Sequence, residues 1–258
     1  HFVINSEIDG TFPAHHPDPS VEANMQQLRD LILAEKCDLG FAFDGDGDRV
    51  GIIDDRGQML LGDQILLLLS RQMLKKKPGA TIIADVKTSQ AFFDDVRQNG
   101  GKPLMWKTGH SLIKAKMKEV DAALGGEMSG HIFFAEGYYG FDDGIYAALR
   151  FIDMLYASGA PMSDMTKTLP QLVSTPEIHH TCPDDLKFGI VDRLKAKLMA
   201  EGHSFNDVDG IRFEDEEGWW LLRASNTQPA LITRVEAKTE EGLQNLKAML
   251  EGLMSELL

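Results

Sequence analysis

The chain has 258 residues, of which 43% are hydrophobic, and its 40 acidic and 26 basic side chains give a formal charge of −14. This length and apolar content allow a buried core divided among two or three domains. The acidic balance argues against a nucleic-acid-binding protein, which needs a basic surface. A phosphate site would therefore have to be a local basic pocket.

Two further features of the composition concern the compartment. Cys37 and Cys182 are too few for a disulfide framework, which favours a reducing cytoplasm. No apolar run reaches the roughly 18 residues of a membrane-spanning helix, and no signal peptide is visible.

The chain opens His1-Phe-Val-Ile-Asn5 without Met, as if in the middle of a strand. We therefore expect a fragment that lacks an N-terminal part.

Residues 1–58 are expected to form the C-terminal part of an α/β domain. A polar loop precedes a predicted helix at Val21–Glu35, whose apolar residues recur at helical spacing and which Ser20 can cap. A strand at Leu39–Phe43 and a hairpin around Asp54–Gly57 follow.

Residues 59–170 alternate between helical and strand-like segments. Helices are expected at Leu61–Lys75, Ser89–Asn99, Ser111–Glu119 and Gly144–Ala157, and strands at Ala80–Val86, Lys102–Lys107, Ala122–Leu124 and Ile132–Glu136. The alternation predicts a largely parallel α/β sheet, in which ligands bind beyond the carboxyl ends of the strands.

Residues 171–258 show a different order of elements. A strand at Glu177–Thr181 and a helix at Leu186–Ala200 precede strands at Gly210–Glu214, Trp219–Arg223 and Leu231–Ala237 and a helix from Glu240. This order predicts a small α+β domain with an antiparallel sheet. The predicted fold is therefore mixed or parallel α/β domains followed by an α+β domain.

The most informative motif is Asp44-Gly-Asp46-Gly-Asp48-Arg49, directly after a predicted strand. Three carboxylates at alternate positions repel one another unless a hard cation such as Mg²⁺ or Ca²⁺ lies among them. Arg49 adds a bidentate phosphate ligand, and a metal beside an arginine suits phosphoryl transfer. An EF-hand would need flanking helices and a glycine at Arg49, and a solvated acidic turn is the other alternative.

A second motif, Gly126-Glu127-Met-Ser129-Gly-His131, lies between two predicted strands. Glu127 and Ser129 can bind vicinal sugar hydroxyls, and His131 can exchange protons near neutral pH. An ordinary turn, in which these side chains bind backbone amides, is an equally good interpretation.

A third motif is a turn rich in hydrogen-bonding groups after the strand that ends near Arg223. One guanidinium, two hydroxyls and an amide gather there, which suits a phosphate dianion, and no acid occurs between Arg223 and Val235. The residues are Arg223, Ser225, Asn226 and Thr227. The alternative is a polar turn closed by Pro229.

Two weaker candidates follow other strand ends. His110 begins a helix, where backbone N–H groups favour anions, and Lys87 follows Asp85-Val86. Read alone, a single histidine is more often structural. The aromatic pairs Tyr138-Tyr139 and Trp219-Trp220 are interpreted as packing residues.

In order and spacing, these motifs resemble those of the α-D-phosphohexomutase superfamily over essentially the whole chain. Asp44–Arg49 resembles its metal loop, Gly126–His131 its sugar loop and Arg223–Thr227 its phosphate loop. The sequences Gly126–His131 and Trp106–Lys114 are most similar to bacterial phosphomannomutase/phosphoglucomutase.

The resemblance implies a role for each candidate residue. Asp44, Asp46 and Asp48 would hold Mg²⁺, and Arg49 would stabilise the transferring phosphoryl group. Glu127 and Ser129 would bind the 3- and 4-hydroxyls of the sugar. The distal phosphate would be bound by Arg223, Ser225, Asn226 and Thr227. Near the reacting oxygen would lie Lys87, His110 and His131, with one of the two histidines assisting proton transfer.

The superfamily has four domains, and the first carries a phosphoserine in a Ser-His-Asn-Pro-like motif. No Ser-His-Asn occurs in this chain. The resemblance therefore implies that the N-terminal domain and half of the second are missing, and that this chain alone is inactive.

The expected function of the complete protein is interconversion of hexose 1-phosphate and hexose 6-phosphate, with mannose and glucose as sugars, through a bisphosphorylated intermediate. Its partner would be the phosphosugar, with no nucleic acid or membrane. One alternative is a phosphoglucosamine mutase, for which Met128 is the position to compare. Another is a protein that binds metal or sugar phosphate without catalysis.

Overall fold

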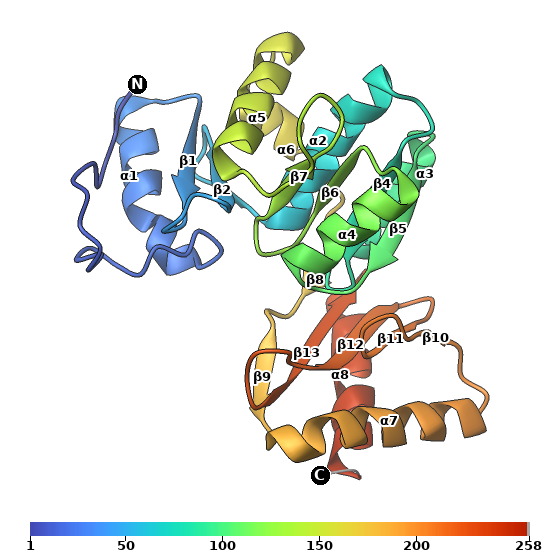
Figure 1. Cartoon of the computed structure of the whole chain (residues 1–258). Helices are drawn as coiled ribbons and strands as arrows, with labels where there is room; N and C mark the ends of the chain where they lie inside the picture. The colour runs from blue at the N-terminus through green and yellow to red at the C-terminus, as the bar shows by residue number, and fades with distance from the viewer. Residues whose placement is uncertain (257–258) are drawn as a thin grey trace. The chain divides into compact units, whose positions relative to one another are not determined.

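The computed structural model describes residues 1–256 and divides into two compact units, one of residues 1–169 and one that begins at Pro170 (Figure 1). Each unit has a hydrophobic core of its own. No helix in the described part of the chain has the length and apolarity that a bilayer crossing requires.

The first unit begins with an antiparallel sheet backed by a helix. The 3₁₀ turn η1 (Glu22–Met25) leads into helix α1 (Gln26–Glu35), which packs on strand β1 (Leu39–Phe43). Strands β2 (Val50–Asp54) and β3 (Met59–Leu60) complete the sheet. These strands pair in chain order, and both pairs are antiparallel. The predicted strand and the predicted hairpin are confirmed.

Two expectations for this region are wrong. Residues 1–5 do not continue a strand but are irregular. The helix does not begin at Val21 with Ser20 as its cap, because the Ser20 hydroxyl donates to the Asp18 carboxylate at 2.6 Å and the backbone N–H of Ser20 donates to the same oxygen. The tight turn at Asp18 thus uses the hydroxyl that would have capped the helix.

The rest of the first unit is an α/β layer. Its helices are α2 (Gly62–Lys76), α3 (Gln90–Gln98), α4 (His110–Val120), α5 (Gly144–Ser158) and α6 (Met162–Thr166), and its strands are β4 (Thr81–Asp85), β5 (Lys102–Trp106), β6 (Leu124–Gly126) and β7 (Ile132–Phe134). The strand order is β5-β4-β6-β7. Strand β4 is parallel to β5 and β6, whereas β7 is antiparallel to β6. The loop between β6 and β7 is too short for the crossover that a parallel pair needs, so the sheet is mixed.

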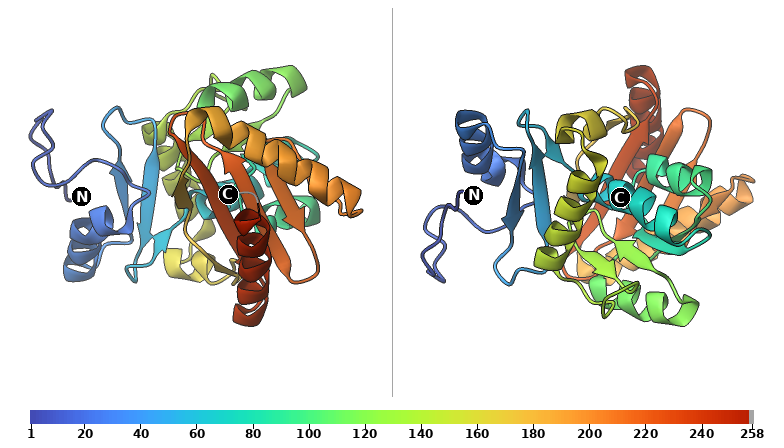
Figure 2. Two further views of the ribbon diagram at one scale, coloured as in Figure 1. Left: turned by 90° about the horizontal axis from the view of Figure 1, so that it is seen from below. Right: turned by 90° about the horizontal axis from the view of Figure 1, so that it is seen from above.

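Side-chain alternation along β4 shows how the helices cover this sheet. Ile82 and Ala84 join the large core that includes α2, α3 and α5, whereas Ile83 joins a smaller core with Ile113 and Met117 of α4. Helix α5 contacts β1 and β2 as well as α2 and β7 (Figures 1 and 2). The two sheets of the first unit therefore share one core.

The second unit is α+β. It contains β8 (Val173–Ser174), β9 (Ile178–Thr181), α7 (Asp184–Ala200), β10 (Phe205–Asn206), β11 (Ile211–Glu214), β12 (Gly218–Ala224), β13 (Ala230–Ala237) and α8 (Glu240–Ser255). The sheet order is β10-β11-β12-β13-β8, with β9 also on β13, and every pair is antiparallel. Trp219 and Trp220 are both buried, as expected of packing residues. The predicted fold class is confirmed, and only the short α6, β8 and β10 were not expected.

Candidate active site

The three aspartates of the acidic loop converge between β1 and β2. Asp44, Asp46 and Asp48 each offer a carboxylate oxygen within 4.8 Å of the other two. Gly47 has a φ of +78°, which a residue with a side chain rarely adopts, and it lets the chain fold the alternate carboxylates inward. Because strands flank the loop on both sides, it is not an EF-hand, which helices would flank.

Arg49 closes this loop. Its backbone N–H donates to Oδ1 of Asp44 at 3.0 Å, its Nε to Oδ2 of Asp44 at 2.8 Å and its Nη1 to Asp18 at 3.1 Å. Burial opposes ionisation of Asp44, but these hydrogen bonds from Arg49 outweigh it and hold the pKa of Asp44 below its usual value. The guanidinium is thus fixed beside an ionised carboxylate.

The pKa of the third aspartate is shifted in the opposite direction. Burial raises the pKa of Asp48, and the carboxylates of Asp44 and Asp46 add to the rise, although His131 opposes it. Like charges at this distance favour a cation among them, and the donors are all oxygens. The three carboxylates therefore fit a hard divalent ion such as Mg²⁺ or Ca²⁺.

Helix α5 begins against the acidic loop. The backbone N–H of Gly144 donates to the carbonyl oxygen of Gly47 at 3.0 Å. A Cβ at Gly144 would lie 2.6 Å from the carbonyl oxygen of Arg49, so only glycine fits this close approach without a shift.

The loop between β6 and β7, residues 127–131, docks onto the start of β2. The backbone N–H of Val50 donates to the carbonyl oxygen of Gly130 at 3.1 Å, and Arg49 and His131 form an isolated antiparallel bridge. Gly130 has a φ of +99°, and a Cβ there would lie 2.8 Å from the Val50 carbonyl oxygen. This contact joins the predicted metal loop to the predicted sugar loop.

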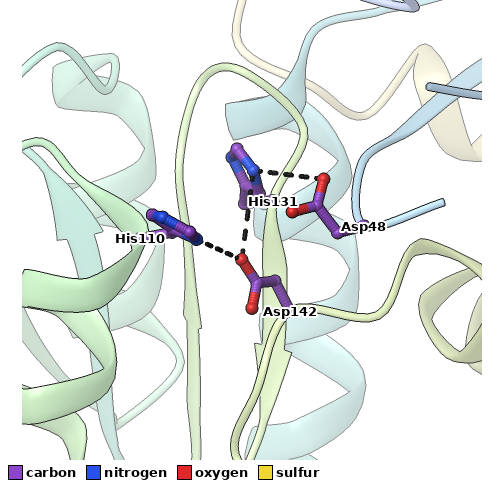
Figure 3. Close-up of side chains that lie close together, drawn as sticks. All are labelled: Asp48, His110, His131 and Asp142. Carbon is purple, nitrogen blue, oxygen red and sulfur yellow. Dashed lines mark hydrogen bonds and ion pairs between the residues drawn. The ribbon is translucent and has the colours of Figure 1, made fainter. Parts of the chain in front are cut away.

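His131 lies at the centre of the site (Figure 3). Its Nδ1 is 3.2 Å from Oε2 of Glu127 and 2.9 Å from Oγ of Ser129, and its Nε2 is 3.4 Å from Oδ1 of Asp48. Burial lowers the pKa of His131, but Glu127, Asp48 and the nearby Asp142 outweigh it and raise the pKa above its usual value.

Glu127 is buried and ionised. Burial opposes its ionisation, but hydrogen bonds from His131 and from the Gly109 N–H, at 2.6 Å, and the charge of Lys87 hold its pKa below the usual value. Lys87 is itself 8% exposed, and its Nζ lies 3.9 Å from Asp85. Lys87 therefore belongs to the same site, which the sequence alone supported only weakly.

His110, the first residue of α4, meets a residue that the sequence analysis missed. Its Nδ1 is 2.7 Å from Oδ2 of Asp142, and Nζ of Lys114 is 2.7 Å from Oδ1 of the same carboxylate. Burial opposes ionisation of Asp142, but Lys114 and His110 lower its pKa. The signal in the sequence was a second glycine-flanked acidic turn, Gly140-Phe-Asp-Asp-Gly144.

The first unit thus gathers most of the candidates, drawn from four segments of the chain. They are Asp44, Asp46, Asp48, Arg49, Lys87, His110, Glu127, Ser129 and His131. Parallel strands β4, β5 and β6 place the segments with Lys87, His110 and Glu127 at one edge of the sheet, because the carboxyl ends of parallel strands meet there.

The remaining four candidates lie in the second unit, Arg223 near the end of β12 and the other three in the turn between β12 and β13. Arg223 is buried, and its Nε donates to Asp209 at 3.0 Å, an acidic partner that the sequence analysis did not anticipate. The Ser225 hydroxyl oxygen accepts from the backbone N–H of Gln228 at 3.1 Å. Asn226 and Thr227 are exposed at the tip of the turn.

Comparison with protein families gives three matches along the chain. Residues 2–57 match the model of phosphoglucomutase/phosphomannomutase alpha/beta/alpha domain II, residues 61–173 match alpha/beta/alpha domain III, and residues 181–253 match the C-terminal domain. The domain boundaries after residues 58 and 170 stay a prediction.

Individual relatives agree with these matches. A phosphomannomutase/phosphoglucomutase of Pseudomonas aeruginosa is 45% identical over 243 residues, which are 94% of this chain and 52% of that protein. A phosphoglucomutase of Neisseria meningitidis is 41% identical over 250 residues, 96% of this chain and 54% of that protein. The chain thus spans about half the length of the curated relatives it matches.

Solved structures show the same likeness. A phosphoglucomutase/phosphomannomutase family protein from Burkholderia thailandensis has a TM-score of 0.91 at 41% identity, over 98% of this chain and 54% of that one. An N-acetylphosphoglucosamine mutase from Aspergillus fumigatus, solved with GlcNAc-6P and magnesium, has a TM-score of 0.59 at 16% identity, over 84% of this chain and 48% of that one. The second likeness shows the fold alone.

The docking of the 127–131 loop on β2 predicts a specific cost at Gly130. Gly130→Ala should lower the free energy of unfolding by about 1–3 kcal/mol, because alanine is strained at this φ and its Cβ meets the Val50 carbonyl. Urea denaturation measures it. Gly100→Ala is the control, since Gly100 has a φ of +78° but open space around it. Equal losses in the two variants would contradict the contact.

The pair of Glu127 and His131 predicts a pH effect. Glu127→Gln should lower the pKa of His131, measured by NMR titration of the imidazole, whereas Glu136→Gln, at an exposed pair with Lys77, should leave it unchanged. Because the folded-state pKa of His131 is raised, protonated His131 stabilises the fold below its usual pKa of 6.5. That stabilisation is lost as the pH rises through the raised value. A His131 pKa that is unchanged in Glu127→Gln would rule out the pair.

Proposed function

Since the chain belongs to the phosphoglucomutase/phosphomannomutase family, we propose that the protein containing it interconverts hexose 1-phosphate and hexose 6-phosphate, with mannose and glucose as its sugars. One observation carries the proposal. The docked loops bring three convergent carboxylates, a fixed guanidinium and two imidazoles to one point. Phosphoryl transfer between hydroxyls needs a metal, charge stabilisation and a proton acceptor.

In this proposal the reaction begins with a phosphoserine outside these residues, which donates its phosphoryl group to one end of the sugar. The resulting bisphosphate then reorients in the site, and the serine takes back the other phosphoryl group. Asp44, Asp46 and Asp48 would hold Mg²⁺, which when bound neutralises charge on the transferring group. Arg49, held in place by Asp44 and Asp18, would bind the equatorial phosphoryl oxygens.

The proposed sugar contacts are coupled to the proposed proton acceptor. Glu127 and Ser129 would bind the sugar 3- and 4-hydroxyls, yet both contact Nδ1 of His131. A bound sugar would therefore share these partners with the imidazole, whose Nε2 faces Asp48. We assign proton transfer to His131, with Lys87 and His110 as neighbouring binders of the reacting oxygen and the phosphoryl group.

The second unit would supply the distal phosphate site. Arg223 would give a charge-assisted hydrogen bond, and Ser225, Asn226 and Thr227 would give neutral ones. Because the bisphosphate must be bound in two orientations, a distal site that recognises phosphate rather than sugar suits both.

Two unpaired cysteines, Cys37 and Cys182, support a cytoplasmic location as part of the proposal.

The proposed reaction is tested on the protein in which the family's domain I precedes these domains. Coupled assays with Mg²⁺ would follow mannose, glucose and glucosamine 1-phosphates. Comparable turnover of mannose and glucose supports the proposal, since the two sugars differ only at the 2-hydroxyl. Preference for glucosamine would indicate the alternative mutase. Absence of turnover would leave a protein that binds metal or sugar phosphate without catalysis.

The metal assignment predicts the effect of one conservative change. Asp46→Asn in that protein should lower kcat by about 10²–10³-fold or more, because the loop loses a charged oxygen ligand. The same assay, with calorimetric titration of Mg²⁺, measures it. Asp38→Asn, at an exposed aspartate outside the loop, is the matched control. Near-normal turnover and Mg²⁺ affinity in Asp46→Asn would refute the assignment.

The distal phosphate site predicts a loss of affinity without a loss of stability. Thr227→Val should weaken glucose 1-phosphate binding about 5-fold, the value of one neutral hydrogen bond, while the melting temperature stays the same because Thr227 is exposed. Ser204→Ala, also exposed in the second unit, should change neither quantity. Unchanged affinity in Thr227→Val would remove this residue from the site.

A further inference from the structure

Four side chains beside the acidic loop form a group of different chemistry. Asp48, His110, His131 and Asp142 each offer one ligand atom, and these four atoms lie within 4.8 Å of one another. They come from the acidic loop, the first turn of α4, the end of the 127–131 loop and the turn before α5, and they point toward one another (Figure 3). Two nitrogens and two oxygens thus face a common point.

The distances within the group are close to those of a tetrahedral site. Zinc lies about 2.0–2.2 Å from its nitrogen and oxygen ligands, so neighbouring ligand atoms are about 3.4 Å apart. Nε2 of His131 is 3.4 Å from Asp48 and 4.0 Å from Asp142, whereas Nδ1 of His110 is 2.7 Å from Asp142. An ion that replaced the proton between His110 and Asp142 would need that pair to open by roughly 0.7 Å.

The outer contacts of the group are an independent observation. Histidines that bind a metal through one ring nitrogen usually donate the other to a carboxylate, which fixes the ring. His131 has this arrangement, with Nδ1 at 3.2 Å from Glu127 and Nε2 facing Asp48. Asp142 is fixed in the same way, because its second oxygen lies 2.7 Å from Nζ of Lys114.

The donor set decides which ions fit. Imidazole suits zinc, copper and nickel, whereas Mg²⁺ and Ca²⁺ prefer a site made only of oxygens, such as Asp44, Asp46 and Asp48. We propose that Asp48, His110, His131 and Asp142 form a second metal site that binds Zn²⁺ or a similar transition-metal ion. Asp48 belongs to both groups, so the two sites are coupled through one carboxylate.

Occupation of this site would have a consequence for the reaction. The ion would take Nε2 of His131, the proposed proton acceptor, and Nδ1 of His110. Zn²⁺ should therefore inhibit turnover even when Mg²⁺ is saturating, a consequence that rests on the proposed function. Binding itself does not rest on it and can be measured on this chain.

The test is a titration of the chain with Co²⁺, a spectroscopic substitute for Zn²⁺, followed by visible absorption in excess Mg²⁺ to fill the oxygen-only site. We expect one saturable equivalent with a tetrahedral spectrum, which Zn²⁺ displaces. His131→Gln and His110→Gln should each weaken binding at least 10-fold, and Glu127→Gln, which removes an outer contact, about 10–100-fold. Because His110 is half exposed, His110→Gln should fold normally.

Two control variants locate the ion. Asp46→Asn should keep Co²⁺ binding, because Asp46 belongs only to the oxygen site. His179→Gln should also keep it, because His179 lies on β9 of the second unit, outside the group. The proposal is wrong if Co²⁺ shows no saturable tetrahedral spectrum, or if His179→Gln abolishes Co²⁺ binding. It is also wrong if Asp46→Asn abolishes Co²⁺ binding whereas His110→Gln and His131→Gln do not.

Discussion

The hydrogen bond from the Val50 N–H to the Gly130 carbonyl is the contact on which the candidate site depends. It lies between the antiparallel sheet that carries the acidic loop and the α/β layer that carries Glu127 and His131. The bridge between Arg49 and His131 adjoins it. Backbone contacts hold their geometry more tightly than long side chains do, so charges from distant segments meet within a few ångströms at little cost in side-chain entropy.

The electrostatics of the site follow from this juxtaposition. Asp44 stays ionised because Arg49 is bound to it, whereas the pKa of Asp48 is raised by burial and by its neighbours. Glu127 and His131 stabilise each other's charged forms, although Glu127 is buried and His131 is partly buried. The carboxylates of such a site bind cations and its arginine binds anions. The proposed phosphoryl transfer needs both.

Sequence reasoning found what is local and missed what is distant. The acidic loop, the 127–131 loop and the order of strands and helices depend on spacings of a few residues, which periodicity and glycine placement reveal. Asp142 escaped because its partner His110 lies 32 residues away, and Asp209 because it lies in a turn 14 residues before its partner Arg223. The Ser20 cap was wrong because Asp18 competes for the same hydroxyl, and local propensity alone does not decide such a competition.

The contacts of Gly144 restrict the grafting of the acidic loop onto another protein. Its N–H holds the Gly47 carbonyl, and its missing side chain makes room for the Arg49 carbonyl. Together with Gly130, it supports the loop from two elements that lie about 80 to 100 residues further along the chain. A designer who grafts residues 44–49 onto another β-hairpin would thus transfer the carboxylates without the two backbone surfaces that shape them, so a faithful graft must carry both glycines and their elements.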